Sequence, residues 1–254
     1  FSEYNKIFNI TPRYRFNKNW AAKVRVPWIA ERTVNVFDED VSASGLGDVT
    51  VEGEYTHLFE TPGTLLRLQA SLKLPTGDHE NSEEYGGGEL VVPLGSGSLD
   101  YMLRGQYTTS TATTGLLVSA MLRKNTEGER QYVYDDGFGY VETQTTTVTE
   151  GNQGFLAVFG RRSLNNGIWL NLGTSILITG DGSGEYNSVD NTGFEYGYTY
   201  DKTTKSTMVD LYPGISYDLG VITPYLGARI PLSTSFDADG MNEDRDTVFL
   251  FQIS

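Results

Sequence analysis

Residues 66–74 read Leu66-Arg67-Leu68-Gln69-Ala70-Ser71-Leu72-Lys73-Leu74, and every second side chain in this stretch is apolar. Successive side chains of a β-strand point to opposite sides, so this alternation predicts a strand with one apolar and one polar face. The same period of two runs through 20–31, 47–59, 98–109 and 220–233. No window sustains the spacing of an amphipathic helix. The sequence therefore predicts an all-β protein.

The composition of the 254 residues excludes several classes of protein. The chain has no cysteine and only two histidines, which leaves no disulfide framework, no thiolate metal site and little for a catalytic triad. Its net charge of -14 argues against nucleic acid as a partner, because phosphate binding needs a basic surface. We expect no cofactor and no enzymatic activity.

The connections between the predicted strands are alternately short and long, which is typical of an up-and-down antiparallel meander. We expect twelve strands, with fourteen as the alternative count, in one domain that spans residues 1–254. Residues 125–151 hold either one more strand or a hairpin within a loop. Strand parity also predicts a further strand before Phe1. The expected strands cover 2–16, 20–31, 47–59, 64–75, 88–95, 98–109, 114–124, 152–162, 167–178, 206–218, 220–233 and 246–254.

The pattern favours a transmembrane β-barrel over a soluble β-sandwich, which stays the alternative. Strands of 10–14 residues match the tilted strands that cross a bilayer, and a closed barrel leaves no backbone unpaired in lipid. The polar face suits a wet lumen. Aromatic side chains gather near strand ends, as in interfacial girdles. These residues are Tyr14, Phe16, Trp20, Trp28, Tyr55, Phe59, Tyr101, Tyr107, Tyr217, Tyr225 and Phe236.

Three segments carry a family resemblance. Residues 44–51 contain Gly45-Leu46-Gly47-Asp48, residues 72–78 read Leu72-Lys73-Leu74-Pro75-Thr76-Gly77-Asp78, and residues 86–100 contain Pro93-Leu94-Gly95-Ser96. They resemble the signatures of outer-membrane transporters associated with the MetA pathway of phenol degradation. The resemblance implies a barrel of about twelve strands in the outer membrane of a Gram-negative bacterium, with short periplasmic turns and long extracellular loops.

A barrel of this family implies a channel that passes small solutes, including aromatic or amphipathic compounds. An export barrel, through which a polypeptide or a partner protein passes, is the alternative function. The expected surroundings are the lipid bilayer and lipopolysaccharide. A second copy of the chain or a periplasmic protein is a further candidate partner.

Two acidic loops are weak candidates for a cation site. The first holds Asp78 and Glu80, and the second holds Asp237 and Asp239. Carboxylates are suitable ligands for hard cations, but the spacing fits no known coordination motif. We therefore favour solvated acidic loops and predict no metal site.

Charge is divided between loops and strands. The windows 31–48, 78–89, 125–150, 180–201 and 237–246 hold 26 of the 33 acidic residues and only 3 of the 19 basic ones. The strand charges lie mostly on the polar face, where they would either form cross-strand ion pairs or attract anions into a pore. Both interpretations remain open. The predicted lumen-lining residues are Arg13, Arg15, Lys23, Arg25, Glu52, Glu54, Arg67, Lys73, Arg104, Arg123, Asp210 and Arg229.

Overall fold

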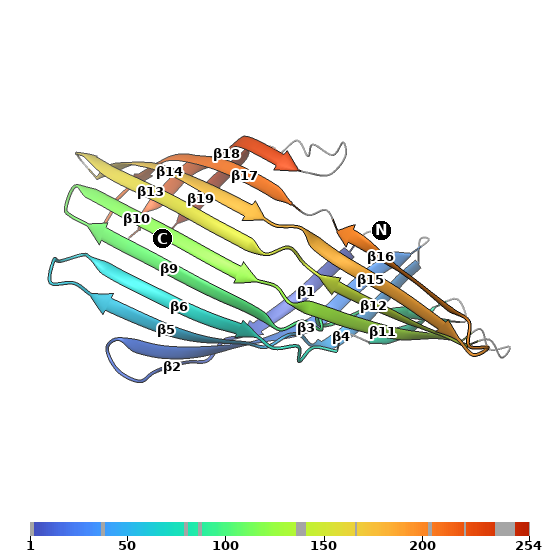
Figure 1. The fold of residues 1–254 in the computed structure, drawn as a ribbon. Coiled ribbons are helices and arrows are strands. Elements are labelled where there is room, and N and C mark those ends of the chain that lie inside the picture. Colours follow the sequence, from blue (N-terminus) through green and yellow to red (C-terminus); the bar gives the residue numbers. More distant parts are fainter. Residues whose placement is uncertain are drawn as a thin grey trace.

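The computed structural model describes residues 3–36, 39–78, 81–85, 88–135, 141–165, 167–202, 205–220, 222–236 and 247–253. Its described part is entirely antiparallel β-structure, as the alternation predicts (Figure 1). One large sheet forms a strongly curved wall in the order β1-β3-β5-β6-β9-β10-β13-β14-β17-β18-β19. The strands β2 and β4 both pair with β3. The described residues form no helix long and apolar enough to cross a membrane.

The strands of the wall are long because the alternating pattern is sustained. Their bounds are β1 Glu3–Ile10, β2 Arg13–Arg15, β3 Trp20–Val36, β4 Glu39–Leu46, β5 Thr50–Leu58, β6 Leu65–Lys73, β9 Asp100–Ser110, β10 Thr114–Lys124, β13 Gln153–Asn165, β14 Ile168–Thr179, β17 Ser206–Tyr217, β18 Pro224–Phe236 and β19 Val248–Ile253.

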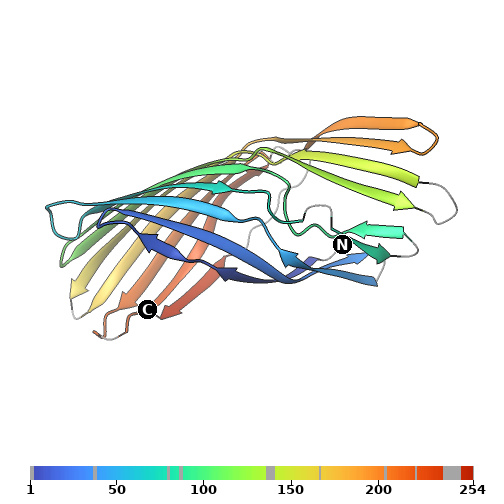
Figure 2. The ribbon, with the colours of Figure 1, turned by 90° about the horizontal axis from the view of Figure 1, so that it is seen from below.

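Short turns lie at one end of the wall and long connections at the other, as the sequence predicts. Two smaller sheets extend the long-connection end (Figures 1 and 2). One contains β11 Glu127–Asp135, β12 Val141–Thr149, β15 Gly182–Asp190 and β16 Glu195–Lys202. The other contains β7 Ser82–Tyr85 and β8 Gly88–Val91.

The predicted strand at 88–95 was wrong as a member of the wall. Strand β8 covers only 88–91 and pairs with β7, while β6 pairs directly with β9. With 88–95 outside the wall, the short turns between neighbouring wall strands all lie at the same end. Residues 125–151 contain the β11–β12 hairpin, which was one of the two alternatives.

Successive side chains of a wall strand alternate between the two faces of the sheet. Along β14, Leu170, Leu172 and Ile176 are exposed, whereas Gly173 and Ser175 between them are buried. Side chains on the concave face of a curved sheet crowd together, and those on the convex face splay apart. The apolar face is therefore the convex outer face, and it is the face expected to meet lipid.

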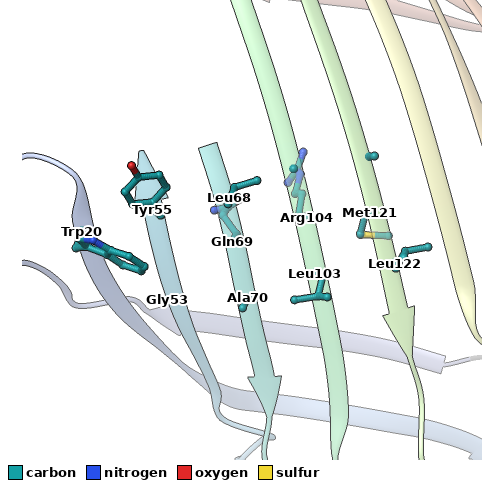
Figure 3. Close-up of a pocket in the computed structure, with 12 residues that line it drawn as sticks. Trp20, Gly53, Tyr55, Leu68, Gln69, Ala70, Leu103, Arg104, Met121 and Leu122 are labelled. Atoms are coloured by element: carbon teal, nitrogen blue, oxygen red, sulfur yellow. The ribbon is translucent and has the colours of Figure 1, made fainter. Parts of the chain in front are cut away.

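The outer face is apolar over several strands. Figure 3 labels one apolar or aromatic side chain of this face from each of β3, β5, β6, β9 and β10: Trp20, Tyr55, Leu68, Leu103 and Leu122. Near the short turns this face carries a chain of aromatic contacts, including Trp20 with Tyr55 at 4.9 Å between ring centroids. These contacts match the predicted girdle in this region. Tyr225 was misplaced in that girdle, because its ring lies over Gly214 and Gly227 on the inner face.

Candidate functional site

The inner face of β2, β3, β5 and β6 carries a ladder of ion pairs. Glu54 accepts a hydrogen bond from Arg13 at 2.5 Å, and the Nε of Arg67 lies 3.8 Å from the same carboxylate oxygen. Glu52 is 2.7 Å from Lys23. Glu52 and Glu54 are both buried. Basic neighbours on the adjacent strands offset the cost of burying each carboxylate.

A second charged cluster lies where the long connections leave the wall. The carboxylate of Asp100 on β9 is 2.6 Å from Lys73 on β6 and 2.8 Å from Arg123 on β10. Lys73 also donates to the hydroxyls of Ser96 and Ser98, at 2.5 and 3.1 Å. A cavity of about 300 Å³ lies against this cluster and reaches Glu150, Gln153 and Thr179.

The structure brings seven of the predicted lumen-lining residues into the ion pairs of these two groups, and Arg25 borders a cavity that it shares with Glu52, Lys73 and Arg123. The seven are Arg13, Lys23, Glu52, Glu54, Arg67, Lys73 and Arg123. Within the described residues, Arg15, Arg25, Arg104 and Arg229 form no ion pair, and Asp210 is buried on β17 near Tyr212. Asp100 belongs with the predicted set, although the sequence analysis did not select it as a site residue. Their role in a pore stays a prediction.

The inner face of β13, β14 and β17 carries aromatic side chains among its polar groups. Phe159 on β13 and Tyr212 on β17 lie 5.4 Å apart between ring centroids, and the ring of Phe159 covers Gly173 on the strand between them. The sequence analysis missed this surface. The available signal was that both faces of 153–160 are apolar, with Phe155 and Phe159 at the positions where the other strands carry charges.

The three motifs of the family resemblance meet at one point. The carboxylate of Asp48 accepts hydrogen bonds from the backbone N–H of Gly77 at 3.1 Å and from that of Ser96 at 2.8 Å. Beside them, Leu94 packs with Ile29 and Val41 in a small buried core. These contacts hold the connection between β6 and β9 against the long-connection end of the wall. The charged cluster around Asp100 lies next to them.

Of the candidate cation ligands, only Asp78 lies within the described residues. Among the described residues, no group of three or more His, Asp or Glu side chains is close enough to hold a metal ion. The backbone carbonyl of Asp78 accepts hydrogen bonds from Leu94 and Gly95. The other candidates, Glu80, Asp237 and Asp239, lie outside the described residues.

The fold has a counterpart among solved structures. The crystal structure of an outer membrane channel from Pseudomonas putida F1 matches it with a TM-score of 0.50, over 97% of this chain and 79% of that chain. The two sequences are 10% identical, so the likeness concerns the fold. No protein-family model and no curated protein matches the chain. The fold is thus that of a transmembrane β-barrel, as the alternation predicts.

Proposed function

We propose that the chain is a channel in the outer membrane of a Gram-negative bacterium and that it passes small amphipathic solutes. The observation that carries this proposal is the inverted distribution of polarity: exposed apolar side chains cover the outer face, and ion-paired side chains line the inner face. In a soluble protein the apolar face would be covered. In a bilayer, lipid covers it, and the charged face meets water.

The inner wall supports amphipathic solutes because its two sides differ. Strands β2, β3, β5, β6 and β9 present mainly charged and amide groups, whereas β13, β14, β17 and β18 present Phe, Tyr and Gly beside fewer charges. A solute with one polar and one apolar side finds a matching surface on each. The resemblance of 44–51, 72–78 and 86–100 to transporters of aromatic compounds supports the same solute class. The single-domain barrel over 1–254, with its short turns toward the periplasm, is part of the proposal.

Reconstitution tests the proposed function. The purified chain should require detergent, should conduct ions in a planar lipid bilayer, and should let small sugars and amino acids, but not a large dextran, swell proteoliposomes. A chain that stays monomeric without detergent and forms no conductance would contradict the proposal. Passage of an unfolded polypeptide at a rate similar to that of small solutes would favour the export barrel instead.

A further inference from the structure

A hollow lined by aromatic side chains and one arginine lies on the inner face toward the short-turn end. It has a volume of about 350 Å³, within the range of small-molecule sites, and it is bordered by Leu117, Phe159, Arg161, Tyr212 and Tyr225. One row of paired positions across the sheet beneath the hollow contains three glycines together with Arg161 and Asn171. Gly115 pairs with Arg161, and Asn171 pairs with Gly214, which in turn pairs with Gly227.

Aromatic rings form the apolar walls of this hollow. The ring of Tyr225 lies against Gly214 and Gly227, where any larger side chain would displace it. The ring of Tyr212 is held near Phe159 and by its hydroxyl, which lies 3.2 Å from the hydroxyl of Ser175. Rings held in this way present apolar surface without further loss of conformational entropy. A planar aromatic ligand can therefore stack on them or meet their edges.

One cationic group faces the same hollow. Arg161 extends across Gly115, and its guanidinium lies 4.8 Å from the centre of the Trp169 ring. It is exposed and forms no ion pair within the described part of the chain. This contrasts with Lys23 in the ladder of ion pairs and Arg123 in the charged cluster around Asp100, which are both paired with carboxylates. A guanidinium held against an aromatic ring retains donors that can bind a carboxylate in a fork geometry.

We propose that this hollow is a binding site for a small planar aromatic carboxylate of the benzoate class. The carboxylate binds the guanidinium of Arg161, and the ring of the ligand packs among Phe159, Tyr212 and Tyr225. The inference rests on the proposed function, since it names the kind of solute that pauses in the channel. A neutral aromatic compound lacks the ion pair, and acetate lacks the ring.

Calorimetric titration of the protein in detergent micelles tests the site without any need for conduction. Benzoate should bind measurably more tightly than acetate or benzyl alcohol. Arg161→Gln should lower the benzoate affinity by about tenfold or more, because it removes a charge-assisted hydrogen-bonded pair. The matched control is Arg162→Gln, because Arg162 is the next residue and faces the outer side of the same strand. It should leave the affinity unchanged.

A second variant covers the case in which Arg161→Gln disturbs folding. Tyr212→Leu should bring the affinity for benzoate close to that for cyclohexanecarboxylate, a ligand of similar size without a planar ring. Equal benzoate affinity in the parent, Arg161→Gln and Arg162→Gln proteins would overturn the proposal, as would equal affinities for benzoate and acetate. Potassium chloride conductance of the same preparations separates the two proposals. Binding without conductance contradicts the channel alone, and conductance without binding contradicts the site alone.

Discussion

Asp48 and Ser96 are 48 positions apart, yet the carboxylate of Asp48 accepts hydrogen bonds from both the backbone N–H and the hydroxyl of Ser96, at 2.8 and 2.7 Å. The same carboxylate accepts the backbone N–H of Gly77. Three segments that look like separate motifs in the sequence are therefore one structural unit. This unit holds the connection between β6 and β9 beside the charged cluster of Lys73 and Asp100.

Replacing Asp48 with alanine should loosen this connection. The variant leaves two backbone donors without their acceptor, at a cost of about 1–3 kcal/mol for each donor that stays buried. We expect a lower urea midpoint for unfolding in micelles. We also expect a larger single-channel conductance, because the connection between β6 and β9 no longer keeps its position at the long-connection end of the channel. Unchanged stability and unchanged conductance would contradict this account of the motifs.

Gly95→Ala tests the same unit by steric means. A Cβ atom at Gly95 would lie 2.5 Å from the carboxylate of Asp48 and 2.7 Å from the carbonyl oxygen of Gly77. The substitution should therefore reproduce the effect of the Asp48 variant. Gly53→Ala is the matched control, since no atom lies within 4 Å of the corresponding position on β5. A similar loss of stability in both glycine variants would show that the crowding at Gly95 has no special role.

Leu68 and Gln69 test the assignment of the two faces. Leu68 is 46% exposed on the outer face, whereas Gln69 donates a hydrogen bond to Glu52 on the inner face. Leu68→Arg should cost about 2–4 kcal/mol of barrel stability, because it places a charge in the hydrocarbon region. Gln69→Arg should be tolerated far better. Refolding into lipid vesicles, followed by heat-modifiable gel mobility, measures both, and equal tolerance would reverse the assignment.

If the chain forms the proposed channel, we expect its ion selectivity to depend on the basic residues that the ladder leaves unpaired. Arg25 and Arg104 have no carboxylate partner among the described residues, whereas Arg67 shares Glu54 with Arg13. We expect a mild preference for anions at high salt that weakens at low salt, where the acidic loops are less screened. Arg25→Gln should reduce the preference more than Arg67→Gln. Reversal potentials under a potassium chloride gradient measure it, and a cation-selective pore at every concentration would refute the prediction.

The turn between β15 and β16 should become less stable at acidic pH. The carboxylate of Asp190 accepts hydrogen bonds from the hydroxyl and the N–H of Thr192 and from the N–H of Phe194, and these bonds lower the pKa of Asp190 below its ordinary value of 3.8. Because the pKa of Asp190 is lower in the folded turn, the ionised carboxylate stabilises the fold at every pH above the ordinary pKa. This stabilisation is lost as the pH falls through the lowered pKa of the folded state.

Amide hydrogen exchange of residues 183–200 should therefore accelerate below about pH 4 beyond the intrinsic change in the exchange rate. The Asp190→Asn variant keeps an acceptor oxygen but does not titrate, so its corrected exchange rate should not depend on pH in this range. A parent protein with the same flat profile would show that Asp190 does not couple this turn to pH.

The sequence by itself determines the fold class and the two faces of the wall. Strict alternation in segments such as 66–74 is a local property: a period of two places Leu68 and Gln69 on opposite faces whatever the neighbouring strands are. Short polar connections likewise predict hairpins. The same reasoning fails at 88–95, where an apolar run marks a buried segment of a long connection. In that segment, Val92 and Leu94 pack against Ile29 instead of joining the wall.

Only the tertiary structure decides which inner side chains meet. The register between strands sets Glu54 between Arg13 and Arg67, and the path of the β6–β9 connection brings Ser96 to Asp48. The aromatic hollow beside Arg161 likewise needs glycines on several strands to fall in one row. The physical reason is that periodicity is fixed within a strand, whereas register, curvature and loop path depend on contacts between residues far apart in the chain.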